Sequence, residues 1–241
     1  MLANHWNQRT ELLLGEEKLE KLKNACVMVV GLGGVGAAAA EMIARAGVGK
    51  MVIVDCDVVE QSNRNRQLGA LISTNGKPKV EAVGNRLKDI NPDLKLEMAQ
   101  IYLINEAIPQ ILDTHKPDYV IDAIDTLTPK IYLIKHVIDR KIKLVSSMGA
   151  GGKMDPTQVM LGDISETYNC KLARYVRKRL HQQGIYKGVQ VVFSSEKIER
   201  ERVLLTDGSN NKKSVIGTIS YLPPIFGCFC ASVVIRNLSS N

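Results

Sequence analysis

The chain has 241 residues, of which 45% are hydrophobic and 24% are charged. This length can bury a full core, and the composition is that of an ordinary globular protein, which excludes a disordered or fibrous chain. The formal net charge of +7 suits a polyanionic partner such as a nucleic acid or a nucleotide, but a solvated basic surface accounts for the charge alone equally well.

The cysteines indicate a reducing compartment. There are five, an odd number, and no CxxC pair, so we expect free thiols, no zinc ribbon and a cytoplasmic location. The N-terminal sequence MLANHWNQRT lacks the basic start and apolar core of a signal peptide. The apolar tail at 222–238 contains two prolines and an arginine, so we expect no stable membrane insertion.

Strand-like and helix-like segments alternate through the first 150 residues. A charged segment with two leucines at helical spacing predicts a surface helix at 15–23, and the apolar run at 25–30 predicts a strand buried on both faces. A second buried strand is predicted at 50–54. Further helices are predicted at 77–90, 104–112 and 129–140, and further strands at 94–99, 119–124 and 143–147. This alternation predicts an α/β fold with a doubly wound, mostly parallel, Rossmann-like sheet.

The pattern changes after Gly149, where the sequence GAGG predicts a hinge. A basic helix is predicted at 171–180 and a strand at 189–193, followed by a polar, mobile stretch at 196–214. We therefore divide the chain into a Rossmann-like part at residues 1–150 and an extended C-terminal, substrate-side part at 151–241, packed on the same sheet.

A glycine motif, GLGGVG, lies between the first buried strand and an alanine-rich helix. It contributes Gly31, Gly33, Gly34 and Gly36. Glycines in this setting permit a tight turn and bring backbone N–H groups close to phosphates at the positive end of a helix. A tight turn without a ligand is the alternative. Asp55 ends the second strand, where a carboxylate can accept hydrogen bonds from the ribose of either NAD or ATP.

Cations and a third carboxylate favour ATP over NAD. Arg66 in SNRNRQ and Lys79 in GKPK follow closely after Asp55, and Asp125 ends a later strand. Well-placed donors of this kind stabilise charge that develops on leaving pyrophosphate by about 3 kcal/mol each. A carboxylate at the carboxyl end of the sheet is a suitable Mg²⁺ ligand, which makes Asp125 the predicted metal residue. Lys79 alone is equally explained as a solvated lysine at the start of a helix.

The motifs GLGGVG, DCDVVEQSNRNRQ, GKPKVEA and DAIDT, in this order, resemble the ubiquitin-activating-like (ThiF/MoeB/HesA) adenylating enzymes over about residues 9–150. In that superfamily ATP adenylates a carboxylate and pyrophosphate leaves, and the enzymes are commonly homodimers. With the four glycines, the predicted ATP contacts are Asp55, Asp57, Ser62, Asn63, Arg66, Lys79, Asp125 and Thr126. The resemblance implies that Arg9 corresponds to an N-terminal arginine that reaches phosphates, in dimers those of the other subunit.

The later motifs AGGKMDPTQV, ARYVRKRLHQQGI and GTISYLPPIFG resemble the tRNA threonylcarbamoyladenosine dehydratases, so the resemblance spans nearly the whole chain. Those enzymes use ATP to activate the threonyl carboxylate of threonylcarbamoyladenosine in tRNA, and attack from within the same side group closes a ring with loss of water. The resemblance implies ATP, Mg²⁺ and a tRNA carrying threonylcarbamoyladenosine, with a homodimer and a sulfur-relay protein as further expected partners. Asn169 and Cys170 depart from it, because Asp-Pro is expected there.

Other functions stay open at this point. An activator of a ubiquitin-like or sulfur-carrier protein would need an acceptor cysteine, for which Cys170 is the candidate, but such activators usually carry paired CxxC motifs. An NAD-dependent dehydrogenase and an inactive tRNA-binding scaffold are further alternatives. The predicted basic helix presents Lys171, Arg174 and Lys178 on one side, which with Lys187 and Lys197 is either a contact for a tRNA backbone or a solvated face.

Overall fold

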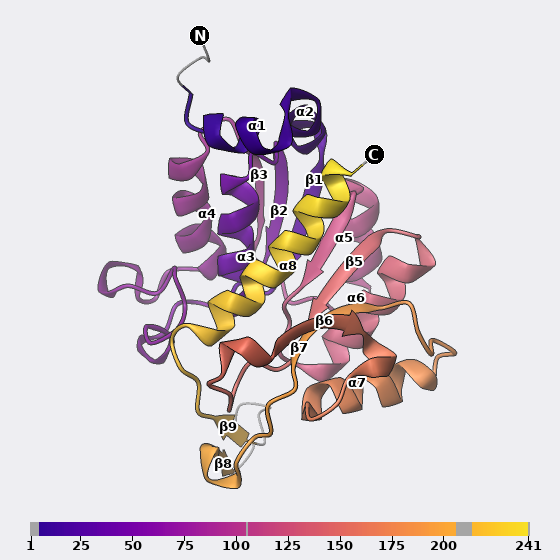
Figure 1. The fold of residues 1–241 in the computed structure, drawn as a ribbon. Coiled ribbons are helices and arrows are strands. Elements are labelled where there is room, and N and C mark those ends of the chain that lie inside the picture. Colours follow the sequence, from indigo (N-terminus) through magenta and orange to yellow (C-terminus); the bar gives the residue numbers. More distant parts are fainter. Residues whose placement is uncertain (1–4, 105, 206–213, 241) are drawn as a thin grey trace.

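A seven-stranded sheet runs through the computed structural model, which describes residues 5–104, 106–205 and 214–240 (Figure 1). The strand order is β3-β2-β1-β4-β5-β7-β6, and only β6 is antiparallel to its neighbour. The strands are β1 (Cys26–Val30), β2 (Lys50–Val54), β3 (Lys95–Ala99), β4 (Tyr119–Asp122), β5 (Lys143–Ser147), β6 (Val159–Asp163) and β7 (Gln190–Ser194). A small hairpin, β8 (Val203–Leu205) and β9 (Ser214–Ile216), lies outside the sheet. The predicted doubly wound α/β fold is confirmed.

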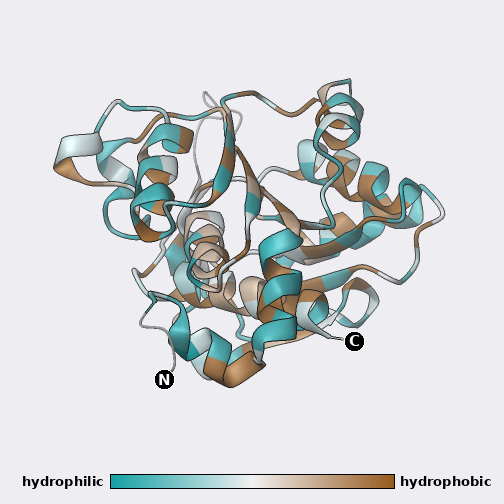
Figure 2. Ribbon diagram, turned by 90° about the horizontal axis from the view of Figure 1, so that it is seen from above, coloured by the Kyte–Doolittle hydropathy of each residue, from teal (hydrophilic) through white to brown (hydrophobic). Residues whose placement is uncertain are grey.

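Helices cover both faces of the sheet. They are α1 (Gln8–Leu14), α2 (Glu16–Asn24), α3 (Gly34–Arg45), α4 (Lys79–Ile90), α5 (Ala107–His115), α6 (Leu127–Asp139), α7 (Lys171–His181) and α8 (Leu222–Ser239). One core contains residues of α3, α4 and α8, and the opposite face packs against α5, α6 and α7. Hydrophilic and hydrophobic segments follow one another along these helices, as expected where one side of each helix is buried (Figure 2).

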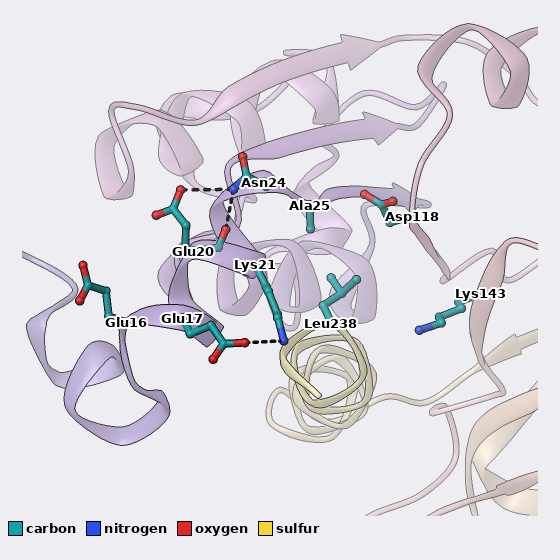
Figure 3. Close-up of a pocket in the computed structure, with 9 residues that line it drawn as sticks. All are labelled: Glu16, Glu17, Glu20, Lys21, Asn24, Ala25, Asp118, Lys143 and Leu238. Atoms are coloured by element: carbon teal, nitrogen blue, oxygen red, sulfur yellow. Dashed lines mark hydrogen bonds and ion pairs between the residues drawn. The ribbon is translucent and has the colours of Figure 1, made fainter. Parts of the chain in front are cut away.

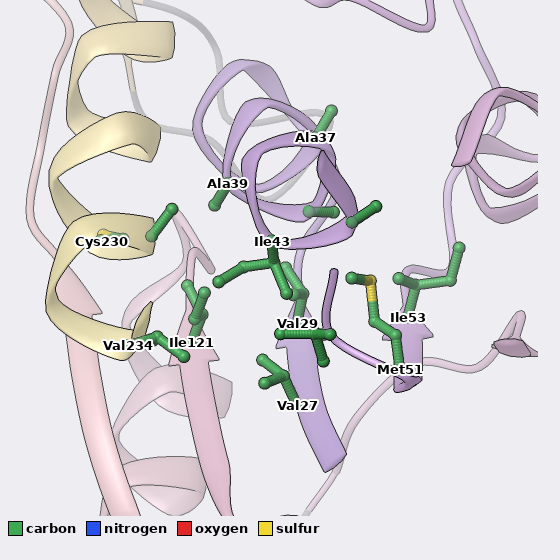
Figure 4. Packing of buried hydrophobic residues seen from close by; sticks show 14 of the residues in the cluster. Val27, Val29, Ala37, Ala39, Ile43, Met51, Ile53, Ile121, Cys230 and Val234 are labelled. Atoms are coloured by element: carbon green, nitrogen blue, oxygen red, sulfur yellow. The ribbon is translucent and has the colours of Figure 1, made fainter. Parts of the chain in front are cut away.

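The apolar runs of the sequence form the central strands because both faces of the sheet are covered. Val27 and Val29 of β1 belong to the core shared with α3 and α8 (Figure 4). Met28 and Val30 belong to the core under α5 and α6. All four are at most 3% exposed. Complete burial of one such side chain contributes about 1.5–3 kcal/mol, so β1 anchors the sheet and fixes the position of the loop that follows it.

The apolar tail forms α8, which is the longest helix among the described residues in spite of its two prolines. Pro223 and Pro224 lie in its first turn, where proline needs no hydrogen-bond donor. By length and composition α8 could cross a membrane, but half of that segment is buried in the protein. Its Gly227 permits close packing on α3, because an added Cβ would lie 2.5 Å from the carbonyl oxygen of Val35. A core helix therefore accounts for its composition.

Other details differ from the sequence prediction. α1 was not predicted, and β4 ends at Asp122, so Asp125 lies three residues beyond the strand that we expected it to end. Part of the polar stretch at 196–214, residues 206–213, lies outside the described residues. All five cysteines are free, as predicted. The division of the chain at residue 150 stays a prediction; β6 and β7, which follow it, extend the same sheet.

Candidate functional site

The topology of the sheet defines a crevice at the carboxyl end of β1. This strand pairs with β2 on one side and with β4 on the other, so the chain winds in opposite directions from this point. Ligands of open α/β sheets bind at such a switch point. The glycine loop (residues 31–36) follows β1, Asp55 follows β2, and the loop that carries Asp125 and Thr126 follows β4. The fold therefore brings these predicted residues to one edge.

Two glycines of the loop are needed to make the turn. Gly31 has a φ of +88°, and a Cβ there would lie 2.8 Å from the carbonyl oxygen of Ala123. A Cβ on Gly36 would lie 1.7 Å from the carbonyl oxygen of Gly31. Neither position accepts a side chain, so these glycines set the geometry of the turn and need not touch a ligand.

The other two glycines, Gly33 and Gly34, differ in how much space lies beside them. A Cβ on Gly34 would lie 2.9 Å from the carbonyl oxygen of Arg66 and 2.8 Å from Cβ of Pro223, so protein fills this side. Gly33 differs, since a Cβ there would meet only Nε2 of Gln67, at 3.9 Å. Open space thus remains at the N-terminus of α3, where backbone N–H groups and the helix dipole favour phosphate. Of the four glycines, Gly33 has the open cradle that a phosphate requires.

Asp55 is held beside the glycine loop by backbone donors. The Leu32 N–H donates to its Oδ2 at 2.6 Å and the Asp57 N–H donates to its Oδ1 at 2.8 Å. Burial raises the pKa of Asp55, and the nearby charge of Lys79 and these two hydrogen bonds oppose the shift. The carboxylate therefore has a fixed orientation, as recognition of a ribose requires.

Lys79 is buried in spite of its position at the start of α4. Only 8% of the residue is exposed, and its Nζ donates to Asp57 Oδ2 at 2.7 Å. The Lys79 N–H also donates to the carbonyl oxygen of Asp57. The solvated lysine considered from the sequence is thus wrong, and the structure instead holds this ammonium group against the loop that follows Asp55.

Arg66 is oriented by two acceptors of its own loop. One of its terminal nitrogens donates to the carbonyl oxygen of Ser62 at 2.9 Å and to Asn65 Oδ1 at 2.7 Å. Asn63 is buried, and its Oδ1 accepts a hydrogen bond from the Glu60 N–H, which stabilises the preceding turn. Ser62 is exposed. The structure therefore gives Asn63 a role in shaping the loop that presents Arg66.

Two places at the nucleotide edge offer carboxylates to Mg²⁺: the loop after β2 and the loop after β4. Asp55, Cys56 and Asp57 place their ligand atoms within 4.8 Å of one another. However, Asp57 pairs with Lys79, and burial together with the two aspartates raises the pKa of Cys56 to about 11, so this thiol stays protonated. Asp125 is an exposed carboxylate in the loop at the switch point. It therefore fits the predicted metal residue better than this cluster does.

A buried ion pair under the same loop was not predicted. Lys130 is fully buried, and its Nζ donates to Asp122 Oδ2 at 2.7 Å and to the carbonyl oxygen of Ser147 at 3.0 Å. Asp122 also accepts a hydrogen bond from Ser146 and one from the Ile124 N–H. These bonds fix the first residues of the segment that leads to Asp125. The sequence of α6 contains two lysines, Lys130 and Lys135, and no local pattern shows that the first of them is buried.

The segment at 216–221 connects three parts of the site and was also missed. The carbonyl oxygen of Thr218 accepts a hydrogen bond from Asn65 Nδ2 at 2.9 Å. The carbonyl oxygen of Gly217 accepts a hydrogen bond from the Gly152 N–H at 2.7 Å. Tyr221 Oη donates to the carbonyl oxygen of Met154. The segment therefore ties the loop of Arg66 to the glycine hinge and leads directly into α8.

Arg9 lies far from the glycine loop of its own chain. It is an exposed residue of α1, which stands at the amino edge of the sheet (Figure 1). Asn7 Nδ2, just before α1, lies 3.3 Å from the Cβ position of Gly47, beyond the end of α3, whereas the glycine loop begins α3. The 12 residues of α3 separate these ends by about 18 Å. The structure therefore does not bring Arg9 to this site within one chain.

A cavity of about 970 Å³ also lies at the amino edge and is separate from the nucleotide edge. Figure 3 shows it between α2, the end of α8 and the starts of the strands, with Asp118 and Lys143 on its wall. Its Glu17 pairs with Lys21, and Glu20 accepts a hydrogen bond from Asn24. These acidic groups do not suit a nucleotide.

The cysteines offer no accessible thiolate for a thioester. Cys170 is buried, with 6% exposure, and lies beside Gly149. Cys56 is exposed but is held protonated, and burial raises the pKa of Cys228 as well. The geometry thus favours chemistry that needs no nucleophile from the protein.

Comparison with known proteins agrees with this geometry. Residues 7–241 match the ThiF family. The chain belongs to the ThiF family. It is 45% identical over 231 residues to the tRNA threonylcarbamoyladenosine dehydratase of Bacillus subtilis, covering 95% of this chain and 89% of that protein. The crystal structure of the Escherichia coli enzyme of this name in complex with ATP aligns with a TM-score of 0.86 and 33% identity, covering 99% of this chain and 96% of that one.

The sequence match to a relative with another activity covers only part of the chain. A molybdopterin-synthase adenylyltransferase of Salmonella typhimurium is 36% identical over 139 residues, which are 58% of this chain and 54% of that protein. The match to the Bacillus subtilis dehydratase instead covers 95% of this chain, so the share of the chain that is matched distinguishes these two relatives.

Proposed function

We propose that this protein is an ATP-dependent tRNA threonylcarbamoyladenosine dehydratase, an adenylating enzyme of the ligase or cyclase type. The observation that carries the proposal is the full-length similarity to dehydratases, one of which is known in complex with ATP. The open cradle at Gly33, with Asp55, Lys79 and Arg66 at the same edge, supports it. A redox cofactor with only two phosphates would not need both cations.

The predicted contacts other than the turn glycines Gly31, Gly34 and Gly36 have the following roles in this proposal. The phosphates of ATP lie at Gly33 and the N-terminus of α3, and Asp55 accepts hydrogen bonds from the ribose. Lys79 and Arg66 neutralise charge that develops on the leaving pyrophosphate. Asp125, with Thr126 beside it, would hold Mg²⁺, which supplies further positive charge to the phosphates. The exposed Ser62 and Asp57 border the same space, whereas Asn63 acts by shaping the loop.

The chemistry balances without a protein nucleophile. A carboxylate oxygen of the threonyl group attacks the α-phosphorus, and pyrophosphate leaves. An atom of the same side group then attacks the acyl carbon, the ring closes, and AMP leaves with the former carboxylate oxygen. The modified adenosine loses the mass of one water in total, and the oxygen of that water ends in the phosphate group of AMP. Proximity within one side group supplies the acceleration of the second step, which agrees with the burial of Cys170.

The position of Arg9 leads us to propose a homodimer in which this residue acts on the partner's nucleotide. Arg9 is exposed at the edge opposite its own glycine loop, and the neighbouring Leu12 and Leu13 of α1 are 62% and 83% exposed. A second subunit would cover these leucines. If so, a dimer of one Arg9→Ala subunit and one Arg66→Ala subunit has one complete site out of two. Mixing the two variants should therefore restore about a quarter of the wild-type activity if subunits pair at random and about half if every dimer is mixed, whereas neither variant alone should turn over.

Location and further partners complete the proposal. Five free cysteines suit the cytoplasm, where tRNA modification takes place. A sulfur-relay protein stays a predicted partner, with no surface assigned to it.

Mass spectrometry of nucleosides tests the activity. The protein is incubated with ATP, Mg²⁺ and tRNA that carries or lacks the threonylcarbamoyl group, and the nucleosides are then weighed. We expect the modified adenosine to lose one water only when ATP is present. An unchanged mass would refute the dehydratase. If ATP is consumed only when a small carrier protein is added, the result would instead support an activator of a ubiquitin-like or sulfur-carrier protein.

A further inference from the structure

The excess positive charge of the chain is concentrated in one segment. Residues 167–195 contain six basic residues and no aspartate or glutamate, a charge of +6 against +7 for the whole chain. The basic residues are Lys171, Arg174, Arg177, Lys178, Arg179 and Lys187. The segment comprises α7 and the turn that follows it, together with β7. A field this local marks a surface for a polyanion.

Five of the six cations of this segment are exposed and form no ion pair with a carboxylate of the described residues. Arg177 points inward and donates to the carbonyl oxygens of Thr167 and Ile164. Several cations of other helices are paired, for example Lys23 with Glu20 and Lys135 with Asp139, whereas the five exposed cations of α7 and the turn after it have no such pair in the part of the chain that the structure describes. The difference indicates that the partner of α7 lies outside the subunit.

Aromatic rings are interleaved with these cations. Tyr175 is 42% exposed and Tyr186 is 63% exposed. The guanidinium of Arg174 lies 5.3 Å from the centre of the Tyr175 ring, and the ring of His181 lies 5.1 Å from that of Tyr186. Ala173, Val176 and Leu180 form the buried side of the helix, so Tyr175 stands on its solvent side, and the exposed Tyr186 follows the end of the helix. Basic and aromatic side chains on one face are typical of a surface that binds unpaired nucleotides.

The position of α7 connects this surface to the nucleotide edge. The helix starts after Cys170, whose Sγ lies 3.8 Å from the Cβ position of Gly149, just beyond the carboxyl end of β5. From there its 11 residues extend about 16 Å. A strand bound along α7 would therefore lead toward the edge that carries Asp125 and Arg66.

We propose that the α7 face, formed by Lys171, Arg174, Tyr175, Lys178, Arg179 and Tyr186, binds unpaired nucleotides of an RNA loop. The cations contact phosphates, and bases stack on Tyr175 and Tyr186. A paired stem offers phosphates but no free base faces, so the tyrosines favour the loop over the stem. The inference rests on the proposed function in that the loop belongs to the tRNA substrate, but binding needs neither ATP nor the modification.

Two unmodified, labelled RNAs test the proposal on the whole protein: a hairpin with an unpaired loop, and a blunt duplex with the same number of phosphates. Affinities are measured by fluorescence anisotropy across a range of salt concentrations. We expect Tyr175→Ala and Tyr186→Ala each to weaken binding of the hairpin about tenfold, since a stacked base contributes about 1–3 kcal/mol. Neither change should alter binding of the duplex or the salt dependence, and the corresponding Tyr→Phe variants should bind the hairpin normally.

Removal of a cation should affect RNA binding in a different way from removal of a tyrosine ring. Lys178→Ala should weaken binding of both RNAs and lower the slope of log affinity against log salt by about 1. Trp6→Ala and Lys23→Ala serve as controls, because they remove an exposed aromatic ring and an exposed cation at the opposite edge of the sheet. Both controls should bind like the wild type, and thermal unfolding of every variant verifies that it is folded.

The outcomes separate this proposal from the enzymatic one. Wild-type affinity for the hairpin in both tyrosine variants, or equal loss for hairpin and duplex, would overturn the stacking surface even if the protein dehydrates tRNA. Selective loss for the hairpin in the tyrosine variants would support it, even if no dehydration is found. The wild-type nucleoside assay alone decides the enzymatic proposal.

Discussion

The cations at the nucleotide edge and the cations of α7 are treated in opposite ways by the fold. Lys79 and Lys130 are buried, and each donates to an aspartate at 2.7 Å. The exposed cations of α7 have no carboxylate partner in the described part of the chain. The first pair has one fixed geometry, whereas the second set keeps its rotamer freedom.

This difference corresponds to what each region has to bind. A nucleotide occupies one defined position, so its cations act best when they are oriented before it arrives. RNA presents many phosphates in variable positions, so mobile side chains can follow it. Buried charges also need a partner to offset their desolvation, which exposed ones do not. Changes in the two regions should therefore affect different properties.

Removal of a buried cation should have the largest effect. Lys130→Met leaves the buried Asp122 carboxylate without its counter-ion, and we expect the free energy of unfolding to fall by about 3–5 kcal/mol. Urea denaturation followed by circular dichroism measures it. The double variant Lys130→Met, Asp122→Asn should recover part of the loss, because no uncompensated charge remains. A single variant as stable as the wild type would contradict the role of this ion pair.

Arg66→Ala should abolish most of the turnover and leave the fold intact. Loss of one well-placed donor to developing charge lowers kcat by about 10²–10³-fold. Among the described residues the guanidinium bonds to acceptors within its own loop, so little stability should be lost. Arg64→Ala is the matched control, since this exposed neighbour donates to the carbonyl oxygen of Gln61. Full activity of Arg66→Ala would rule out its phosphate role.

Affinity for ATP should fall on acidification in a way that depends on Asp55. Burial raises the pKa of this carboxyl above its usual value of 3.8, so it loses its charge at a higher pH than an exposed aspartate. Only the ionised form accepts both ribose hydrogen bonds, and affinity should therefore drop several-fold, by about 1 kcal/mol, as the pH approaches that raised pKa from above. Titration of ATP binding from pH 8 to pH 4.5 measures it, and Asp55→Asn should bind weakly without this dependence.

The effect of Asp55 on folding has the opposite sign. Because the folded protein disfavours the ionised form, this group stabilises the fold fully below pH 3.8, and that contribution is lost as the pH rises through the raised pKa. ATP affinity and the contribution of Asp55 to stability should thus change in opposite directions over this interval. A parallel change in both would contradict the assigned cause of the shift.

Lys178→Gln should have the smallest effect on the folded protein. The side chain is exposed and has no carboxylate partner in the described residues, so we expect the free energy of unfolding to stay within about 0.5 kcal/mol of the wild type. RNA affinity should nevertheless fall. A clear loss of stability would show that the cation serves the fold after all.

Local patterns predicted the sheet and much of the nucleotide edge. The apolar runs of β1 and β2 show continuous burial, and the glycines followed by Asp55 indicate a strand–turn–helix unit with a carboxylate at the next strand end. These features depend on neighbouring residues only. The prediction that Asp125 ends a strand was wrong by three residues, because the last residues of a strand are set by pairing and not by composition.

Features that depend on distant residues were missed. Lys130 looks like a surface lysine until β4 and β5 supply Asp122 and Ser147 as partners. The contact between Asn65 and Thr218 joins residues 153 positions apart, and no periodicity reveals it. Likewise, the close contact between α3 and α8 that Gly227 permits appears only when the two helices pack. Such contacts are tertiary, so one sequence without its fold does not contain a signal for them.

The central claim, that ATP activates the carboxylate by adenylation, is tested most directly with an oxygen label. The substrate is tRNA whose threonyl carboxylate carries ¹⁸O, and the nucleotide products are analysed by mass spectrometry after one turnover. The account predicts AMP and pyrophosphate as products, with one ¹⁸O atom in the phosphate of AMP and none in pyrophosphate. Formation of ADP and phosphate, or AMP without the label while the modified adenosine loses water, would contradict it.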